Sequence, residues 1–248
     1  RRSSVTKVIV TGALGRMGRE VIAGLARESE LDLAGGVDPR AAEEYLDLPD
    51  GGGLIPVGRD LDQIIQRTRP RVMVDFTQAE AAMANARVAL ANKVSPVIGT
   101  SGISPANLDE LSELSEQAGV AVCVIPNFAI GANLMIHFAR VAAKFMDAAE
   151  IIELHHDGKV DAPSGTAVHT AERLAAVKPD WAGDPTERHT LAHARGATSG
   201  TNGVHVHAVR MRGMVAHEEV LLGTMGQTLS IRHDSYDRTS FMPGVLLA

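Results

Sequence analysis

Apolar and polar positions follow two different patterns along this chain, and the change between them divides it into two parts. In the first part, continuous apolar runs rich in Val and Ile alternate with segments of helical periodicity. Strands are predicted at 5–11, 31–37, 71–76, 95–99 and 120–125, and helices at 19–28, 60–66, 79–92 and 104–117. Such runs are typical of strands buried on both faces, so their alternation with helices predicts a doubly wound parallel sheet. Residues 41–58, rich in Gly, Pro and acidic side chains, are expected to form a loop.

The pattern changes at Pro126-Asn-Phe128, which we interpret as a domain boundary. Helices are predicted beyond it at 131–146 and 167–174, and strands at 151–154, 204–210, 217–222 and 227–233. Apolar and polar residues alternate in the later strands, which favours an antiparallel or mixed open sheet with one polar face. Residues 178–203 are expected to form a long mobile loop, and 240–248 to begin a helix that continues in a longer natural chain.

These elements predict an α/β protein with a Rossmann-like doubly wound parallel sheet and a smaller α+β domain that holds the mixed sheet. The first domain is expected to span residues 1–126 and to bind a dinucleotide, with 236–248 returning to it. The second domain, 127–235, is expected to bind substrate and to mediate oligomerisation.

A glycine turn joins the first predicted strand to the first helix. Its sequence, Gly12-Ala-Leu-Gly-Arg-Met-Gly18, differs at Leu14 from the common Gly-x-Gly-x-x-Gly dinucleotide fingerprint. Glycines here let the backbone approach a pyrophosphate, and a helix N-terminus supplies N–H groups for it. The alternative is that the glycines serve tight packing only.

Asp38, at the end of the second predicted strand, can accept hydrogen bonds from ribose hydroxyls and so favours NADH. Arg16 and Arg40 could instead pair with the 2′-phosphate of NADPH, so use of both cofactors is expected. The alternative for Asp38 is a turn residue before Pro39. Ligands of parallel sheets bind beyond the strand C-termini, where the glycine turn, Asp38, Thr77, Gly99–Ser101 and Asn127 would converge.

The densest group of chemically active residues is Glu153-Leu-His-His-Asp-Gly-Lys-Val-Asp-Ala-Pro-Ser-Gly-Thr-Ala167. It places His155, His156 and Lys159 on a glycine-containing loop that follows a strand. Ser164-Gly165-Thr166 then starts a helix, so its backbone N–H groups would face an anion. We interpret the segment as an anion-binding loop with acid–base residues. The alternative is a solvated loop with a helix cap.

Composition removes several function classes. A net charge of −6 and few aromatics (one Trp, two Tyr, five Phe) argue against nucleic-acid binding. No apolar run reaches the length of a membrane span, and the N-terminus lacks the apolar segment of a signal peptide. The single Cys123 is expected to be a buried small hydrophobe, consistent with a reducing, cytoplasmic location. No Cys/His spacing resembles a zinc site, so no metal is expected.

Other polar residues have simpler interpretations. Asp60 and Ser104 are predicted helix N-caps. We expect His137, among apolar neighbours in a helix, to be structural. His205 and His207 share one face of a strand, where an oligomer interface or simple solvation explains them better than catalysis.

The glycine turn and the 153–167 segment together resemble the 4-hydroxy-tetrahydrodipicolinate reductase (dihydrodipicolinate reductase) family of the diaminopimelate route to lysine. The resemblance extends along the chain through Val74-Asp-Phe-Thr77, Gly99-Thr-Ser-Gly102, Pro126-Asn-Phe128 and Arg232-His-Asp-Ser235. It implies an NAD(P)H-dependent oxidoreductase that reduces a cyclic dicarboxylate containing an imine. It also implies a homotetramer built through the sheets of the second domain.

The resemblance also implies roles for individual residues. His155 and Lys159 would act as proton donors. The resemblance gives Asp157 and Asp161 no firm role, and for them we expect a structural one such as orienting the loop. The residues implied for substrate binding are His156, Ser164, Gly165, Thr166 and, on a looser match, Arg238. Those implied for cofactor binding are Gly12, Ala13, Leu14, Gly15, Arg16, Met17, Asp38, Gly99, Thr100, Ser101 (a threonine in many relatives), Ile125, Pro126, Asn127 and Phe128.

Two other functions fit the same residues. A relative without catalysis would bind nucleotide and serve in assembly or regulation, because fold alone does not determine function. A different two-domain NAD-dependent dehydrogenase would act on another imino or oxo acid.

Overall fold

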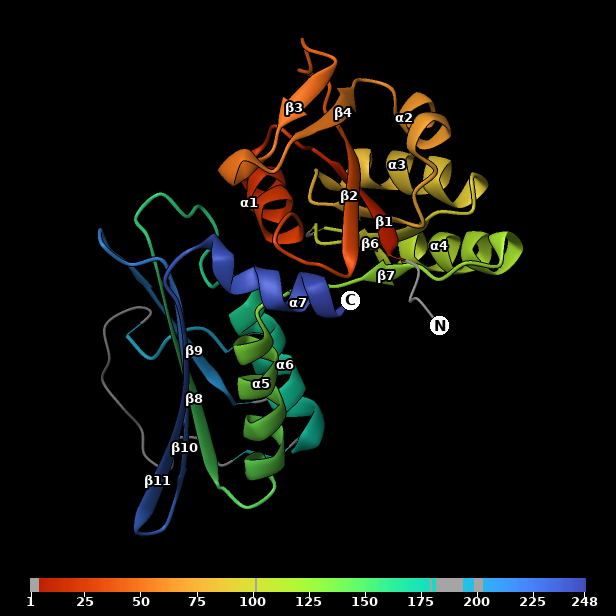
Figure 1. Cartoon of the computed structure of the whole chain (residues 1–248). Coiled ribbons are helices and arrows are strands. Elements are labelled where there is room, and N and C mark those ends of the chain that lie inside the picture. Colours follow the sequence, from red (N-terminus) through yellow and green to blue (C-terminus); the bar gives the residue numbers. More distant parts are fainter. Residues whose placement is uncertain (1–4, 101, 179, 182–193, 199–202) are drawn as a thin grey trace. The chain divides into compact units, whose positions relative to one another are not determined.

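The computed structural model describes residues 5–100, 102–178, 180–181, 194–198 and 203–248, which form two compact units (Figure 1). The first unit comprises Arg1–Phe128 and Phe241–Ala248, and the second comprises Ala129–Ser240. The sequence pattern placed the boundary after residue 126 and the return of the chain at 236. The binding roles expected of the two domains stay predictions at this point.

The first unit contains a seven-stranded sheet in the order β3-β4-β2-β1-β5-β6-β7. Its strands are β1 Thr6–Thr11, β2 Leu31–Val37, β3 Tyr45–Asp47, β4 Leu54–Gly58, β5 Val72–Asp75, β6 Ser95–Ile98 and β7 Cys123–Val124. All neighbouring pairs are parallel except β3 and β4. The predicted Rossmann-like parallel sheet is therefore confirmed.

Helices cover both faces of this sheet. They are α1 Arg16–Leu25, α2 Leu61–Thr68, α3 Ala79–Ala91, α4 Pro105–Ala118 and α7 Met242–Leu247. Val8 and Val10 of β1 pack in one core cluster with α1 and α7, whereas Ile9 between them packs in another cluster with α2. Ile98 of β6 packs with α3 and α4. This alternation along β1 is what two buried faces require.

The predicted caps form as expected. Asp60 Oδ1 accepts from the amide of Gln63 at 3.1 Å, and Ser104 Oγ accepts from the amide of Asn107 at 3.2 Å. Cys123 is half-buried and packs at the edge of the cluster that contains Val8.

Two local predictions for this unit are wrong. Residues 41–58 are not a loop, because β3 and β4 form an antiparallel hairpin through the pairs Tyr45–Pro56 and Asp47–Leu54. Glycines with positive φ shape its turn, and Ile55 packs into the core, so the segment is ordered despite its loop-like composition. The first helix begins at Arg16 rather than after Gly18.

The C-terminal helix α7 packs against α1 and against Phe128 within the same unit. A Cβ at Gly244 would lie 2.0 Å from the carbonyl oxygen of Phe128, so only glycine permits this approach. The helix predicted at 240–248 is present, preceded by a 3-10 turn at Arg238–Phe241.

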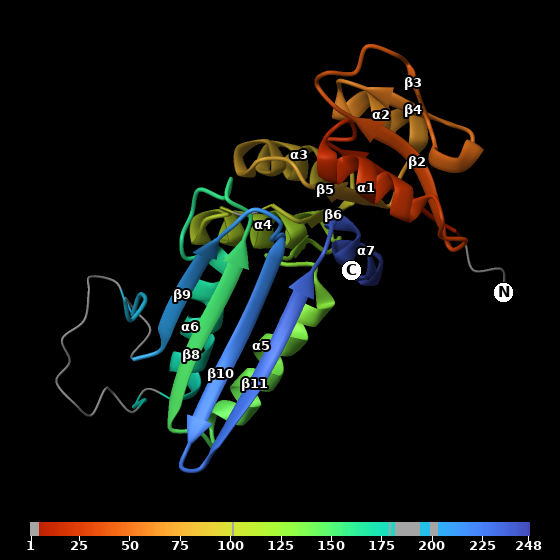
Figure 2. The same cartoon turned by 90° about the vertical axis from the view of Figure 1, so that its left-hand side faces the viewer.

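The second unit is a four-stranded sheet with two helices on one face (Figure 2). Its elements are β8 Ala148–His155, β9 His205–Arg210, β10 Ala216–Thr224 and β11 Gln227–Ser235, with helices α5 Ile130–Ala143 and α6 Gly165–Val177. The order is β11-β10-β8-β9; β8 and β9 are parallel and the other pairs antiparallel, which confirms the predicted mixed sheet. Most of the loop predicted at 178–203 lies outside the described residues.

Three histidines of this unit have contacts that the sequence did not indicate. His137 is exposed on α5, in edge contact with the ring of Phe138, and is not part of the core. His207 is not simply solvated, because its Nε2 lies 2.7 Å from Oε2 of Glu150 on β8. His205 Nδ1 contacts the carbonyl oxygen of Arg195.

Candidate active site

The glycine turn of the first unit is a cradle built from backbone. Gly12 has a φ of +66°, Gly15 is the N-cap of α1, and Gly18 lies in the first helical turn. A Cβ at Gly18 would lie 2.1 Å from the carbonyl oxygen of Gly12, so the close turn requires glycine. The first turn of α1 has neither a side-chain cap nor an acidic residue. Its N–H groups and positive dipole end therefore suit an anion.

Asp38, just after β2, lies beside this glycine turn and contacts its backbone at Leu14. Its Oδ2 accepts from the amide of Leu14 at 2.9 Å, and its Oδ1 accepts from the amide and Nε of Arg40 at 2.9 and 3.0 Å. Burial raises the pKa of Asp38, but the hydrogen bonds from Arg40 and Leu14 outweigh that effect, so the pKa lies below its usual value. Asp38 is thus an ionised carboxylate, while the guanidinium paired with it is largely exposed.

The ends of β5, β6 and β7 meet beside the glycine turn. Thr100 Oγ1 donates to the carbonyl of Thr77, and a Cβ at Gly12 would touch the Thr77 side chain. The ring of Phe76 packs on that of Phe128 with centroids 5.3 Å apart, and a Cβ at Gly99 would overlap Phe76.

The predicted cofactor residues in this region thus come together around one edge of the sheet. Ile125 donates its amide to the carbonyl of Ile98, which aligns the segment after β7 with the end of β6. Arg16 is exposed at the start of α1. Ser101 lies outside the described residues.

Sequence reasoning missed Asp75, the last residue of β5. Its fully buried carboxylate accepts from the amide of Thr77 at 2.7 Å and from Nδ2 of Asn85 at 2.8 Å. This carboxylate therefore fixes the turn that contacts Gly12. An acid directly after a buried apolar run was the available signal.

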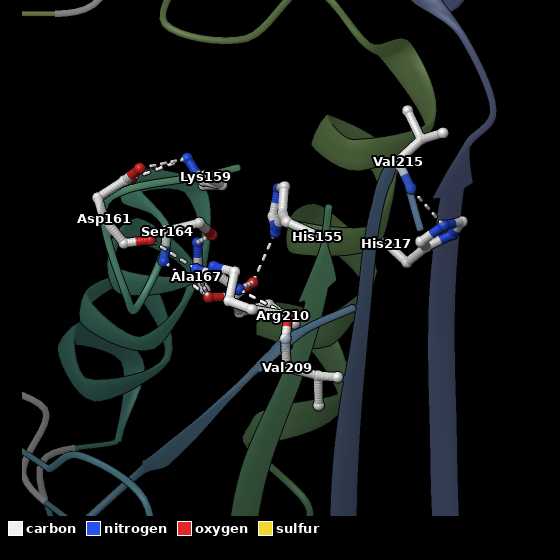
Figure 3. A network of polar contacts seen from close by, with 10 residues as sticks. His155, Lys159, Asp161, Ser164, Ala167, Val209, Arg210, Val215 and His217 are labelled. Atoms are coloured by element: carbon white, nitrogen blue, oxygen red, sulfur yellow. Dashed lines mark hydrogen bonds and ion pairs between the residues drawn. The ribbon is translucent and has the colours of Figure 1, made fainter. Parts of the chain in front are cut away.

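In the second unit, the end of β8 carries a buried carboxylate beside His155. Glu153 is fully buried, and its Oε2 lies 2.6 Å from His155 Nδ1 (Figure 3). Arg210, at the end of β9, donates from Nη1 to Oε2 and from Nη2 to Oε1, both at 2.8 Å. Burial alone would raise the pKa of Glu153, but the hydrogen bonds from Arg210, His155 and Ser164 lower it below its usual value.

The environment of His155 lowers the pKa of its imidazole. Burial is the largest cause, and the nearby charges of Lys159 and Arg210 act in the same direction. The hydrogen bond and charge of Glu153 oppose them. His155 is half-buried, so part of its side chain remains accessible to a ligand.

The loop after β8 presents the remaining polar residues. Lys159 Nζ donates to both carboxylate oxygens of Asp161, at 2.6 and 2.9 Å. Asp161 also accepts from Arg210 Nη2 through its backbone carbonyl at 2.6 Å, which ties the loop to β9. Asp157 pairs with Arg212 at 3.0 Å, and His156 is exposed.

Helix α6 begins where the sequence pattern placed the anion-binding turn. Ser164 is its N-cap: its Oγ accepts from the amide of Ala167 at 3.2 Å. Its own amide donates to Glu153 Oε1 at 2.9 Å. Within the described part of the chain the amides of Gly165 and Thr166 have no acceptor, so two N–H groups at a helix start remain for a ligand.

The structure brings His155, Lys159 and Ser164–Thr166 together around Glu153 and Arg210. Arg238 is exposed in the 3-10 turn and has no hydrogen bond to these residues within the described structure. Glu153 and Arg210 are the residues of this site that sequence reasoning did not single out.

The described residues show neither a metal cluster nor a membrane-spanning helix. They contain no group of three or more His, Cys, Asp or Glu side chains arranged to hold a metal ion. None of the described helices combines the length and apolar character needed to cross a membrane.

Known proteins resemble the chain along both units. The family model described as "Dihydrodipicolinate reductase, N-terminus" matches residues 6–128, and "Dihydrodipicolinate reductase, C-terminus" matches 131–248. The 4-hydroxy-tetrahydrodipicolinate reductase of Moorella thermoacetica is 52% identical over 247 residues, covering 98% of this chain and 91% of that protein. The one from Dehalococcoides mccartyi is 47% identical over 242 residues, with the same coverage of 98% and 91%.

Solved structures agree with these matches. A dipicolinate-bound dihydrodipicolinate reductase from Paenisporosarcina sp. TG-14 superposes with a TM-score of 0.87 at 37% identity, covering 98% of this chain and 92% of that one. An amine dehydrogenase from Mycobacterium smegmatis, at a TM-score of 0.63 and 14% identity, shares the fold alone. The resemblance inferred from the two sequence motifs is confirmed, and the chain belongs to the dihydrodipicolinate reductase family.

Proposed function

We propose that this chain reduces 4-hydroxy-tetrahydrodipicolinate, via dihydrodipicolinate, to tetrahydrodipicolinate with NADH or NADPH in diaminopimelate and lysine biosynthesis. The observation that carries the proposal is the convergence of His155, Lys159 and the open amides of Gly165 and Thr166 around one buried carboxylate. A chain that only bound nucleotide would need no such acid–base group. The family relatives carry the name of this reaction, and one is bound to dipicolinate, a planar cyclic dicarboxylate.

The first unit fits a nicotinamide dinucleotide. Its pyrophosphate would be held by the glycine cradle and the uncapped start of α1, and its adenosine ribose by Asp38. The segments Gly99–Ser101 and Ile125–Phe128, whose described residues lie at the same sheet edge, would hold the rest. A reduced nicotinamide in this position supplies a hydride, and the remaining tasks fall to residues of the second unit.

Binding a cyclic dicarboxylate requires cations and N–H donors. We assign this task to His156, to the helix start at Ser164–Thr166 and to Arg238, with Lys159 available to leave Asp161 for a substrate carboxylate. Charge-assisted hydrogen bonds of this kind are the strong ones. The exposure of His156 and Arg238 leaves both side chains free to reach such a ligand.

Reduction of the conjugated imine places negative charge toward the ring nitrogen, and a proton must be delivered. We assign delivery to His155 Nε2, with Lys159 stabilising the charge and able to donate. Because the pKa of His155 is lowered, the imidazolium that can donate dominates only below its ordinary pKa. We therefore expect kcat/KM to fall as pH rises through that lowered value.

The test is an assay of NADH or NADPH oxidation in which freshly made 4-hydroxy-tetrahydrodipicolinate is the substrate. His155→Ala and Lys159→Ala should each lower kcat by about 10² to 10⁴-fold, the range for loss of a general acid. His137→Ala, which removes an exposed histidine of the same unit, is the matched control and should keep wild-type turnover. Undiminished turnover in the double variant His155→Ala/Lys159→Ala would contradict the assigned roles.

We also propose dual cofactor use with some preference for NADH. Asp38 offers carboxylate oxygens to ribose hydroxyls, while Arg40, exposed and paired with it, could turn to a 2′-phosphate. Arg40→Ala should therefore raise KM for NADPH and leave KM for NADH nearly unchanged. A hundredfold preference of the wild type for NADPH would contradict the proposal.

A homotetramer and a cytoplasmic location complete the proposal. The face of the second sheet opposite α5 and α6 carries half-buried apolar side chains, including Ile152 and Leu221, which suits a contact between copies. Light scattering after size exclusion measures the mass, and a monomer at micromolar concentration would contradict the tetramer.

A further inference from the structure

The carboxylate of Glu153 is shared by three parts of the second unit. Its Oε2 contacts His155 Nδ1 on its own strand, and its Oε1 accepts the amide of Ser164 at the start of α6. Both oxygens also accept from the guanidinium of Arg210 on β9. All four donors lie between 2.6 and 2.9 Å, so each oxygen accepts two hydrogen bonds and the buried charge is fully compensated.

An ionised carboxylate can only accept hydrogen bonds. Glu153 is ionised because the hydrogen bonds from Arg210, His155 and Ser164 overcome the effect of burial on its pKa. The contact at 2.6 Å therefore requires a proton on His155 Nδ1. In neutral His155 the lone pair is then on Nε2, and in the imidazolium the exchangeable proton is on Nε2.

We propose that Glu153 is a positioning residue, which holds a proton on His155 Nδ1 so that Nε2 is the nitrogen that exchanges protons with substrate. Through the amide of Ser164 the same carboxylate fixes the open N–H groups of Gly165 and Thr166 relative to that imidazole. The role rests on the proposed function, since it concerns the proton donor of that reaction.

Arg210 gives this arrangement its rigidity. Its planar fork matches the two carboxylate oxygens, and its Nη2 also reaches the carbonyl of Asp161 at 2.6 Å. Through this contact the loop that carries Lys159 is attached to the ion pair of Glu153 and Arg210. β8 and β9 are parallel, and their register places Arg210 beside His155. The pairing of the two strands therefore brings the guanidinium of Arg210 next to Glu153.

The first experiment needs no substrate. In ¹⁵N-labelled wild-type protein, the imidazole ¹⁵N shifts of His155, assigned by comparison with His155→Gln, should show neutral imidazole with its proton on Nδ1. A proton on Nε2 in the neutral wild type would overturn the proposal. This readout is independent of turnover, so it stands if the proposed reaction is wrong.

The second experiment replaces Glu153 by Gln, which keeps the shape and removes the charge. The neutral tautomer should shift toward a proton on Nε2. The pH above which kcat/KM falls should move down by about one unit, because the charge that favours imidazolium is lost. kcat should fall about 10²-fold. The fluorescence of Trp181, which is buried in the core of the second unit, should be unchanged and shows that the variant is folded.

Glu150→Gln is the matched control. Glu150 lies on the same strand and contacts a histidine and an arginine, His207 and Arg195, but on the opposite face of the sheet. It should leave the His155 tautomer and the pH profile as in wild type. If Glu153→Gln lowers kcat while tautomer and pH profile stay unchanged, Glu153 has only a structural role and the proposal is refuted.

Discussion

Glu218 on β10 is a buried acid whose pKa is raised, so its ionisation lowers stability. It lies on the helix-covered face of the second sheet, between Glu153 on β8 and His233 on β11 in the strand register. Thr170 Oγ1, on α6, is 2.5 Å from Glu218 Oε1 and 2.9 Å from the carbonyl oxygen of Thr166. Thr170 is the donor in its contact with Glu218. Because a hydroxyl has one proton, Thr170 cannot donate to Thr166 and to Glu218 at the same time, so within the described structure the carboxylate has at most one neutral donor to compensate its burial.

Burial raises the pKa of Glu218 from 4.5 to about 7; the charge of Glu153 adds to this, and the contact with Thr170 opposes it. Between these two pH values the folded state binds more protons than the unfolded state. Stability is therefore lost as pH rises through this window. The shift corresponds to about 3 kcal/mol at most, and relaxation and water penetration reduce this to between about 1 and 3 kcal/mol above pH 8.

Glu218→Gln cannot ionise, and its amide oxygen can still accept the hydroxyl proton of Thr170. We expect it to match wild type near pH 5 and to be more stable than wild type near pH 8.5, by roughly 3 to 10 °C in Tm. The single Trp181 is buried in the core of the second unit, so its fluorescence follows the unfolding of that unit. His233 and Glu153 titrate in both proteins, which removes their direct contributions from the difference.

Glu172→Gln, an exposed change on α6, is the matched control and should leave Tm unchanged at both pH values. The reasoning is refuted if Glu218→Gln gains no stability near pH 8.5. It is also refuted by an equal gain at both pH values, since that would make the effect one of packing rather than ionisation.

Three further substitutions test the fold around the cofactor cradle. Gly18→Ala should weaken NADH binding at least tenfold in a fluorescence titration, because its Cβ would lie 2.1 Å from the carbonyl oxygen of Gly12 and displace the turn. Gly244→Ala should lower the Tm of the first unit, because a Cβ there would lie 2.0 Å from the carbonyl oxygen of Phe128 and force α7 away; an unchanged Tm would contradict this close packing. Asp60→Ala should cost about 1 kcal/mol in urea unfolding through loss of the α2 cap, with NADH binding retained.

The fold could be predicted where the spacing of apolar residues along a segment matches the face that the segment buries. β1 and α2 were found because a continuous β-branched run and a capped amphipathic segment have few other interpretations. The β3–β4 hairpin was missed because its strands are short and its Gly/Pro composition is also that of a loop. Its order comes from the packing of Ile55 against the core, which local sequence does not show.

In the candidate site too, some residues could be predicted from local sequence, and others take their place only through the pairing of distant strands. His155, Lys159 and Ser164 could be singled out because they are contiguous and their residue types have few structural uses at that density. Arg210 is 57 positions from Glu153, and only the parallel pairing of β8 with β9 brings them together. From sequence alone, Arg210 is an ordinary polar end of an alternating strand.

The ionisation state of a buried acid, like its position, depends on partners that local sequence does not show, as Glu153 and Glu218 illustrate. They are the same residue type, opposite each other on neighbouring strands and both buried, yet their pKa values shift in opposite directions. The difference lies in their partners: a guanidinium and a backbone amide compensate Glu153, whereas the only donor to Glu218 among the described residues is the neutral hydroxyl of Thr170. Ionising both would place two negative charges side by side on β10 and β8, whereas Arg210 on β9 pairs with Glu153. Below a pH of about 7 Glu218 is protonated, and Glu153 and Arg210 remain the charged pair on which the orientation of His155 depends.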